Sequence, residues 1–297
     1  MNNLKISTTE LAKICGVSQG TVDRALNNRT GINIKTKERI VSTAIKYGYR
    51  PKKSEEKIIG VIVFNLNNEF FTELITNIEK TAYENNYSAV VMFTNYSEEH
   101  EIECILKMYS MGVDGIIICP INSGAEFSNF INGLNIPIVC VGNKIPGCTY
   151  VGIDDYGAMK ELTKSIVTDD FENIIYFSPS LKYRNSYAQM QRFKGFAETL
   201  KDKSFSVISN FSDLNESYNK KTVIICSTDY YAVKVYLKVK NAEITGFDGI
   251  KLLKKFNINI TTVAYSNAEI AKYTFSALKT GKSKIIDYRV VLKRGAV

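Results

Sequence analysis

The sequence predicts two domains: an all-α helix-turn-helix module, followed by a larger α/β domain made of two doubly wound parallel-sheet lobes. Three observations lead to this fold class. Helix-capping residues and apolar residues at helical spacing fill residues 1–51. From residue 58 onward, short apolar strands alternate with amphipathic helices, which is the pattern of parallel sheets covered on both faces. The excess positive charge is concentrated in the first part of the chain.

The N-terminal module contains the start and stop signals of three helices. Ser7 and Glu10 have the spacing of a capping box, in which each side chain satisfies a backbone N–H of the other. Gly16 is expected to end this first helix, since glycine accepts the left-handed conformation. Ser18 and Asn33 are expected to cap the second and third helices. Only Gly-Val-Ser separates the first two helices, so they should pack as a helix-turn-helix.

The composition changes after Pro51. Residues 52–57 are short, charged and free of large apolar side chains, so we predict a linker there between a module at 1–51 and a domain at 58–297. The predicted strands are Ile58–Phe64, Ser88–Thr94, Gly115–Cys119, Pro137–Val141, Ile174–Ser178, Phe205–Ser209, Val223–Ser227 and Ile244–Phe247. The predicted helices between them include Phe71–Glu84, Glu98–Met111, Tyr156–Thr168, Met190–Leu200 and Tyr230–Lys238. Ligands of such folds sit beyond the carboxyl ends of the strands, here in a cleft between the lobes.

Charge separates the two domains. The formal net charge is +8, yet residues 1–57 hold twelve Lys and Arg against five Asp and Glu, so the remaining 240 residues are close to neutral. A basic module beside a neutral body indicates a polyanion partner. The alternative interpretation is a solvated basic surface without a partner.

Several classes of protein are disfavoured by what the sequence lacks. The six cysteines are scattered and form no C-x-x-C pair, which fits a reducing compartment. The N-terminus has no apolar signal core, and the apolar runs are too short to span a bilayer, so we expect a cytoplasmic protein without a membrane partner. The single histidine, His100, lies in a charged stretch, and no catalytic set, metal-ligand spacing or cofactor motif is found.

The most specific pattern is Thr8–Asn27, where the second short helix begins with polar residues that a major groove can receive. Together with Asn33–Ile40 and Tyr47–Pro51, it closely resembles the DNA-binding module of the lactose-repressor (LacI/GalR-type) family. The resemblance implies base reading at Gln19, Gly20 and Arg24, and phosphate anchoring at Ser18, Thr21, Asn33 and Thr36. An arginine can offer a fork to guanine and a glutamine can pair with adenine, whereas a glycine has no side chain to read a base.

The chain departs from the family at two places. Asp23 stands where the family usually has a serine facing a phosphate, so its carboxylate should repel DNA unless it orients Arg24 instead. The family also follows its module with a hinge helix that wedges a leucine into the minor groove. Only Pro51–Lys57 precedes the first strand here, without a leucine, so weak or absent DNA bending is expected.

The larger domain also resembles the family, which implies a periplasmic-binding-protein-like fold. The matching segments are Asn68–Phe71, Val113–Ile117, Val151–Asp155, Arg192–Phe196, Ser227–Asp229 and Gly246–Asp248. By resemblance, the ligand cleft is lined by Phe70, Phe71, Asn143, Arg192, Thr228 and Asp248. Arginine and aspartate can hydrogen-bond hydroxyl groups, and aromatic rings can stack on a sugar face. In the alternative interpretation, the two phenylalanines are core residues and the aspartate belongs to a turn. Short connections from Ser209 to Val223 and from Lys238 to Ile244 predict a trimmed second lobe.

These observations predict a sequence-specific DNA-binding transcription regulator, with repression as the expected mode, controlled by a small-molecule effector. A homodimer on a palindromic double-stranded operator is the expected assembly. A sugar is the first choice of effector and a purine the second. One alternative is an α/β enzyme acting on a sugar or nucleoside, with a basic appendage; another is a solute-binding protein. The missing catalytic set argues against the first, and the helix-turn-helix against the second.

Overall fold

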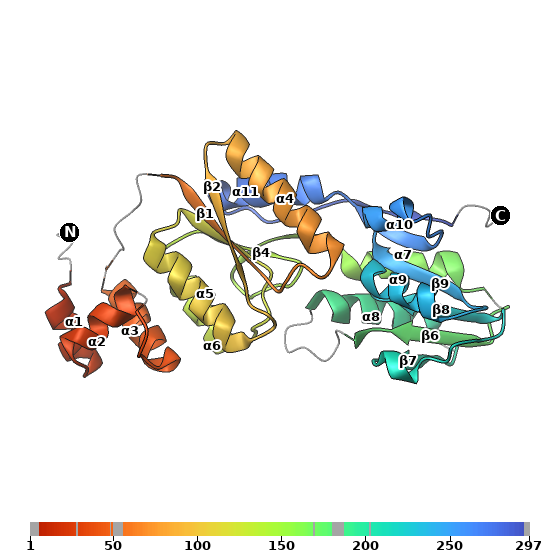
Figure 1. Ribbon diagram of the computed structural model, residues 1–297, viewed down its shortest axis with the longest axis horizontal. Helices are drawn as coiled ribbons and strands as arrows, with labels where there is room; N and C mark the ends of the chain where they lie inside the picture. Colours follow the sequence, from red (N-terminus) through yellow and green to blue (C-terminus); the bar gives the residue numbers. More distant parts are fainter. Residues whose placement is uncertain are drawn as a thin grey trace. The chain divides into compact units, whose positions relative to one another are not determined.

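A computed structural model of the chain describes residues 6–27, 29–47, 49, 56–168, 170–179, 187–201 and 203–293. The chain forms two compact units. The first unit contains the described residues up to Asn65, then Ile75–Val151 and Ala271–Lys284. The second contains Leu66–Leu74, Gly152–Ile270 and the described residues from Ile285 onward. Each unit holds one six-stranded sheet with helices around it (Figure 1).

Three helices open the first unit: α1 (Thr8–Cys15), α2 (Gln19–Leu26) and α3 (Ile34–Lys46). The predicted caps are confirmed. Ser7 and Glu10 form the reciprocal capping box, and Gly16 ends α1 in the left-handed conformation with φ 61°. The Ser18 and Asn33 side chains accept backbone N–H groups at the starts of α2 and α3. The three helices share a small core of their own, formed by Leu11, Ala12, Cys15, Val22, Ala25, Leu26, Ile40 and Ala44.

The sheet of the first unit has the order β11-β5-β4-β3-β1-β2. Its strands are β1 (Ile58–Val63), β2 (Ser88–Phe93), β3 (Gly115–Ile118), β4 (Ile138–Val141), β5 (Thr149–Gly152) and β11 (Lys284–Ile285). The pairs among β1 to β5 are parallel, with Ile58 opposite Ser88 at the start of the β1–β2 ladder. The helices α4 (Glu69–Glu84), α5 (Glu98–Met111) and α6 (Ala125–Gly133) connect strands β1 to β4, and α11 (Asn267–Thr280) precedes β11. The central strands are almost entirely buried because helices cover both faces.

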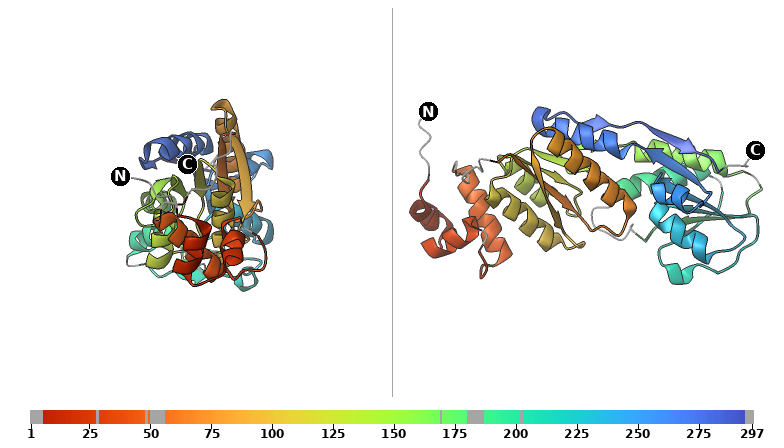
Figure 2. Two further views of the ribbon diagram at one scale, coloured as in Figure 1. Left: turned by 90° about the vertical axis from the view of Figure 1, so that its left-hand side faces the viewer. Right: turned by 45° about the horizontal axis from the view of Figure 1, so that its top comes forward.

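The sheet of the second unit has the order β12-β10-β9-β8-β6-β7. Its strands are β6 (Asn173–Phe177), β7 (Ser206–Ile208), β8 (Thr222–Cys226), β9 (Glu243–Asp248), β10 (Thr261–Tyr265) and β12 (Tyr288–Val291). Its helices are α7 (Asp155–Ile166), α8 (Tyr187–Leu200), α9 (Asp229–Lys238) and α10 (Lys251–Lys255). Helices α7 and α8 pack so closely that a Cβ on Gly195 would come within 2.3 Å of the Tyr156 carbonyl oxygen. Figure 2 shows these elements from two further sides.

All eight predicted strands are present, with ends that differ by at most one residue. Sequence reasoning missed β5, β10, β11 and β12, which are short and rich in threonine, tyrosine or charged residues. The predicted parallel sheets are confirmed, with one antiparallel pair at an edge, where β12 runs antiparallel to β10. Between β7 and β8 the structure has only the one-turn 3₁₀ helix Phe211–Asp213, in keeping with the predicted short connection. No helix within the described ranges is both long and apolar enough to cross a membrane. Residues 52–55, which are most of the predicted linker, lie outside the described residues. The prediction about a hinge helix concerns these same residues.

Candidate functional site

The predicted base-reading residues lie at the start and on the exposed side of α2. Ser18 precedes the helix, and its Oγ accepts the Thr21 N–H at 3.2 Å and lies 2.9 Å from the Thr21 hydroxyl. Gln19 and Arg24 are exposed, and the Gln19 amide donates to the Thr8 hydroxyl of α1 at 3.1 Å. The Arg24 guanidinium is therefore presented to solvent, whereas the Gln19 amide must exchange one internal hydrogen bond to reach a base.

Asp23 contacts residues that follow α2. Its carboxylate forms an ion pair with Arg29 at 3.0 Å and accepts a hydrogen bond from Asn27 at 2.7 Å. Asp23 thus has partners other than Arg24. Both members of the ion pair are largely exposed, so the pair is weak, but it offsets the negative charge that would face a phosphate.

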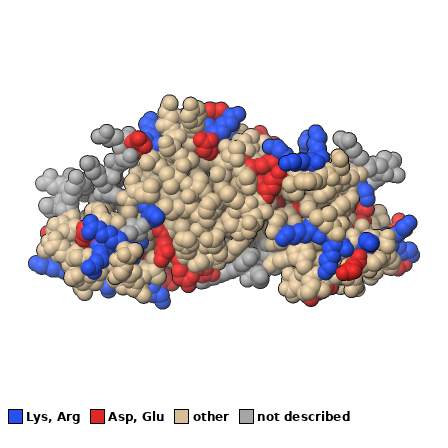
Figure 3. All heavy atoms as spheres, viewed as in Figure 1, with Lys and Arg blue, Asp and Glu red and all other residues tan. Residues whose placement is uncertain are grey.

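The remaining predicted anchoring positions lie at the beginnings of helices. The Asn33 side chain accepts the Lys35 N–H at 3.0 Å, and Thr36 is half-buried in the first turn of α3. Gly20 has open space around it, since an added Cβ would meet only the Ser18 hydroxyl, at 3.9 Å. Lys and Arg side chains gather on the N-terminal helices, at the left of Figure 3. Helix N-termini and nearby cations suit contact with an anionic backbone.

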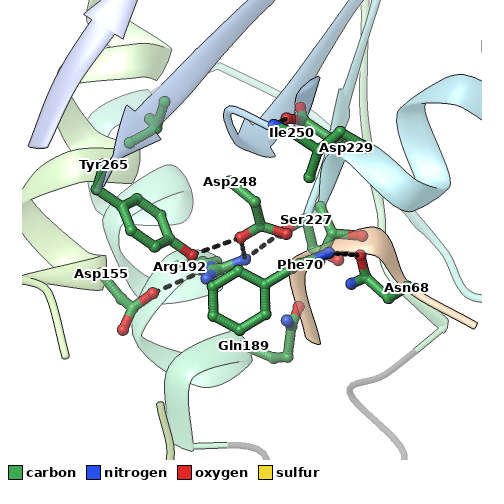
Figure 4. Close-up of polar contacts among 12 residues, drawn as sticks. Asn68, Phe70, Asp155, Gln189, Arg192, Ser227, Asp229, Asp248, Ile250 and Tyr265 are labelled. Atoms are coloured by element: carbon green, nitrogen blue, oxygen red, sulfur yellow. Dashed lines mark hydrogen bonds and ion pairs between the residues drawn. The ribbon is translucent and has the colours of Figure 1, made fainter. Parts of the chain in front are cut away.

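A second cluster of polar residues is built around Arg192 of α8 in the second unit (Figure 4). Its Nε donates to Asp155 at 2.8 Å and its Nη1 to the Ser227 carbonyl oxygen at 2.7 Å. Nη1 also lies 3.2 Å from an Asp248 carboxylate oxygen, and the guanidinium sits 3.7 Å from the centre of the Phe247 ring. The Arg192 side chain is 7% exposed, and those of both aspartates are 3% exposed. We call Arg192, Asp155 and Asp248 the charged triad.

Asp248 occupies an unusual backbone conformation at the end of β9. Its φ is 119°, a region that side-chain-bearing residues rarely adopt, and the next residue, Gly249, also has a positive φ. A Cβ on Gly249 would come within 2.5 Å of the Ala264 side chain, so the turn requires glycine there. This backbone conformation directs the Asp248 carboxylate toward Arg192. The Tyr265 hydroxyl of β10 donates, at 2.8 Å, to the carboxylate oxygen that also contacts Arg192.

Burial and charge shift the protonation of these groups. Burial raises the pKa of Asp248 to about 6, although Arg192 and the Tyr265 hydroxyl oppose the shift. Burial and the neighbouring Asp248 raise the pKa of Asp229 to about 7, against hydrogen bonds from Thr262 and the Ile250 N–H. Burial disfavours the charged guanidinium, but Asp248 and Asp155 outweigh it and raise the pKa of Arg192. Arg192 therefore stays charged, while Asp248 and Asp229 resist ionisation.

Aromatic side chains lie beside the charged triad. The rings of Phe70 and Phe71 meet edge to face with centroids 5.0 Å apart, and Phe70 lies 6.0 Å from the Tyr265 ring. Both phenylalanines are half-buried, and Phe70 packs at the border of the second unit's core, so it serves the core and still presents a surface. Asn68 accepts the Phe70 N–H at 3.1 Å, which fixes the segment ahead of α4.

Two predicted ligand residues have local structural partners. The Thr228 hydroxyl accepts the Tyr231 N–H at 3.3 Å and caps α9. Asn143 belongs to the first unit, where its amide donates to the Pro120 carbonyl oxygen at 3.0 Å. Phe70, Phe71, Arg192, Thr228 and Asp248 all belong to the second unit.

Sequence reasoning did not name Asp155 or Tyr265 as site residues. Asp155 lies in a segment that matched the family motif, but nothing in its local pattern marks it as the partner of Arg192. Tyr265 lies in β10, a strand that the sequence analysis missed. Among the described residues, no group of three or more His, Cys, Asp or Glu side chains is placed to hold a metal ion.

Comparison with known proteins agrees with this arrangement. Residues 59–280 match the family model described as "Periplasmic binding protein domain". Catabolite control protein A of Priestia megaterium is 24% identical and aligns over 97% of this chain and 96% of its own length, which includes the N-terminal helices. The chain belongs to the lactose-repressor (LacI/GalR-type) family of transcription regulators.

Solved structures of this family share the fold of the chain. A regulator from Alkaliphilus metalliredigens complexed with D-xylulofuranose superposes with a TM-score of 0.69 at 19% identity, covering 82% of this chain and all of that one. The lac repressor dimer bound to operator and an anti-inducer superposes with a TM-score of 0.65 at 14% identity, covering 98% and 99% of the two chains. The family membership confirms the predicted fold class, with its helix-turn-helix module and periplasmic-binding-protein-like domain.

Proposed function

We propose that this LacI/GalR-type regulator reads a palindromic operator as a homodimer and represses transcription under the control of a sugar bound by the charged triad. The observation that carries the sugar proposal is the joint placement of a buried Arg192 between two carboxylates, beside aromatic rings. Carboxylate and guanidinium groups hydrogen-bond vicinal hydroxyls, and a ring packs against the apolar face of a pyranose or furanose. The D-xylulofuranose complex of the Alkaliphilus regulator supports this choice of ligand class.

We assign DNA reading to the start of α2. Arg24 is exposed and offers a guanidinium fork to guanine N7 and O6, and Gln19 is placed to pair with adenine once it releases Thr8. Ser18, Thr21, Asn33 and Thr36 are assigned to phosphates, with Gly20 giving the helix room to approach the groove. The lac repressor dimer on its operator supports the same mode of assembly. With DNA as its partner, we expect the protein to act in the cytoplasm.

In this proposal, effector binding and operator binding are thermodynamically linked. An effector that binds one arrangement of the protein more tightly than another shifts the population toward it, and operator affinity changes to the extent that the two arrangements differ. The side chains of the charged triad and the neighbouring rings bind and position the effector. A purine is the second candidate effector, since the half-buried Phe70 and Phe71 rings could stack on a base.

The test has a DNA arm and a ligand arm. In the first, fluorescence anisotropy on a pool of palindromic duplexes at two salt concentrations should select one half-site motif, with affinity that falls steeply as salt rises. In the second, thermal shift against a panel of neutral sugars and purines should find a stabilising ligand whose effect is lost in D248N. The exposed carboxylate of Asp213 in the same unit gives the matched control D213N, which should retain the shift. Stabilisation by a purine alone would replace the sugar, and equal operator affinity with and without the ligand would refute the linkage.

A further inference from the structure

Helix α3 is apolar on two sides, and only one side belongs to the helix-turn-helix core. Ile40 and Ala44 pack with α1 and α2 inside the module. Val41 and Ile45 each follow one of these residues directly in the sequence. They belong instead to the hydrophobic core around the first unit's sheet, together with Tyr109 of α5 and Phe130 of α6. Val41 is 1% exposed and Ile45 is 6% exposed. In a module that moved freely on its linker, this second side of α3 would face water.

Polar contacts accompany the apolar ones. The Tyr109 hydroxyl of α5 donates to the Tyr49 carbonyl oxygen, just after α3, at 3.4 Å. Lys37 is only 6% exposed. Burial lowers the pKa of the Lys37 ammonium, the nearby Glu103 carboxylate of α5 opposes this, and Lys107 adds to it. The negative charge of Glu103 on α5 therefore favours the charged form of the buried Lys37.

The contact with α6 is less complete. Burial, and then repulsion from Glu126 of α6, raise the pKa of Glu38. A groove of about 390 Å³ runs between the two helices, lined by Ser42, Ile45, Lys46, Asn129, Phe130, Gly133 and Asn135. The contact thus combines a buried apolar strip with an open, polar rim, which is the anatomy of an interface between two bodies. Figure 1 and Figure 2 show α3 beside α5 and α6.

We propose that the α5–α6 face of the first lobe is a docking surface for the chain's own DNA-reading module, and that α3 fills it. In the docked state the start of α2 remains exposed, so docking is compatible with DNA reading. A movement of α5 and α6 is then transmitted to α2 through the side chains packed against α3. This transmission does not require a hinge helix. The docked module is also pre-organised, which spares part of the ordering cost of binding DNA.

The docking test uses E103K in the full-length chain. The lysine adds a cation beside Lys37 and Lys107 without touching the core of the module. Hydrogen exchange of the peptide covering residues 34–46 should become about tenfold faster, because like charges brought together are unfavourable. The control is E99K, an exposed glutamate of the same helix with the same change in charge. The double variant E103K/K37E should restore slow exchange, since it recreates an opposite-charge pair.

The outcomes decide the two parts of the proposal separately. Equal exchange in wild type, E103K and E99K would overturn docking, whatever the DNA result. With exchange raised in E103K alone and restored by K37E, docking stands. In the DNA arm, which rests on the proposed function, E103K should bind the selected operator about tenfold more weakly than E99K. Unchanged affinity despite faster exchange would overturn the role of docking in DNA reading, whereas a wild-type protein that selects no operator would refute the proposed function and leave the exchange result standing.

Discussion

Replacing Arg192 by glutamine removes the only cation of the charged triad. The variant R192Q leaves Asp155 and Asp248 buried at 3% exposure without their shared partner, and loses the stacking contact with Phe247 at 3.7 Å. Breaking a buried ion pair from one side costs about 3–5 kcal/mol, because the remaining charge stays desolvated. At a few degrees per kcal/mol, the melting transition of the second lobe should fall by about 10 °C at pH 7.5.

Calorimetry at two pH values separates electrostatics from packing. Because burial raises the pKa of Asp248 to about 6, this carboxyl is largely protonated at pH 5, and the penalty of R192Q should shrink there. The double variant R192Q/D248N should recover part of the loss at pH 7.5. The control K221Q breaks an exposed ion pair with Glu172 and should leave the transition unchanged. If R192Q melts within a few degrees of this control at pH 7.5, the two carboxylates are not held as buried charges and the electrostatic reasoning is wrong.

Four further predictions concern the module, the second unit and its pH dependence. Truncation in R24A should weaken binding to the selected operator by about 1–3 kcal/mol and relax preference at one base pair, as read by anisotropy on matched and mismatched duplexes. The variant S7A removes the N-cap of α1 and should cost the module about 1 kcal/mol in thermal unfolding. G246A places a Cβ 2.0 Å from an Asp229 carboxylate oxygen and should destabilise the second unit by about 1–3 kcal/mol. The pKa values of Asp229 and Asp248 are raised by burial to about 7 and about 6, above those of an unfolded chain. Their stabilising contribution is present at low pH and lost as the pH rises through 6 to 7, so the second unit should melt at a higher temperature at pH 5 than at pH 8. A D229N variant that keeps the same pH dependence would contradict this.

Local sequence signals predicted the parts of the fold that depend on neighbours in the chain. The caps at Ser7, Ser18 and Asn33 could be predicted because a cap and its backbone partner lie within three residues. Strands such as β1, β3 and β8 could be predicted because their burial requires apolar residues throughout. Strands β10 and β12 could not, since their threonine- and tyrosine-containing sequences give a weak apolar signal and their pairing with each other and with β9 is set by the fold.

Site residues divide in the same way. Arg192 and Asp248 were found through motifs that span a few residues, whereas their partners Asp155 and Tyr265 come from segments 37 and 17 residues away in the chain. Which acid pairs with which base is set by the sheet order and by the close approach of α7 and α8. The same holds for Asp23, whose partner Arg29 follows from how the chain leaves α2.

The sequence by itself therefore determined the helix-turn-helix, the alternation of strands and helices and the resemblance to a regulator family, because capping, periodicity and motifs act over short separations. The tertiary structure alone decided that the second apolar side of α3 packs on α5 and α6, and that a single guanidinium serves two carboxylates. Both depend on bringing distant segments together, and the apolar and charged groups involved gain stability only once they share a desolvated contact.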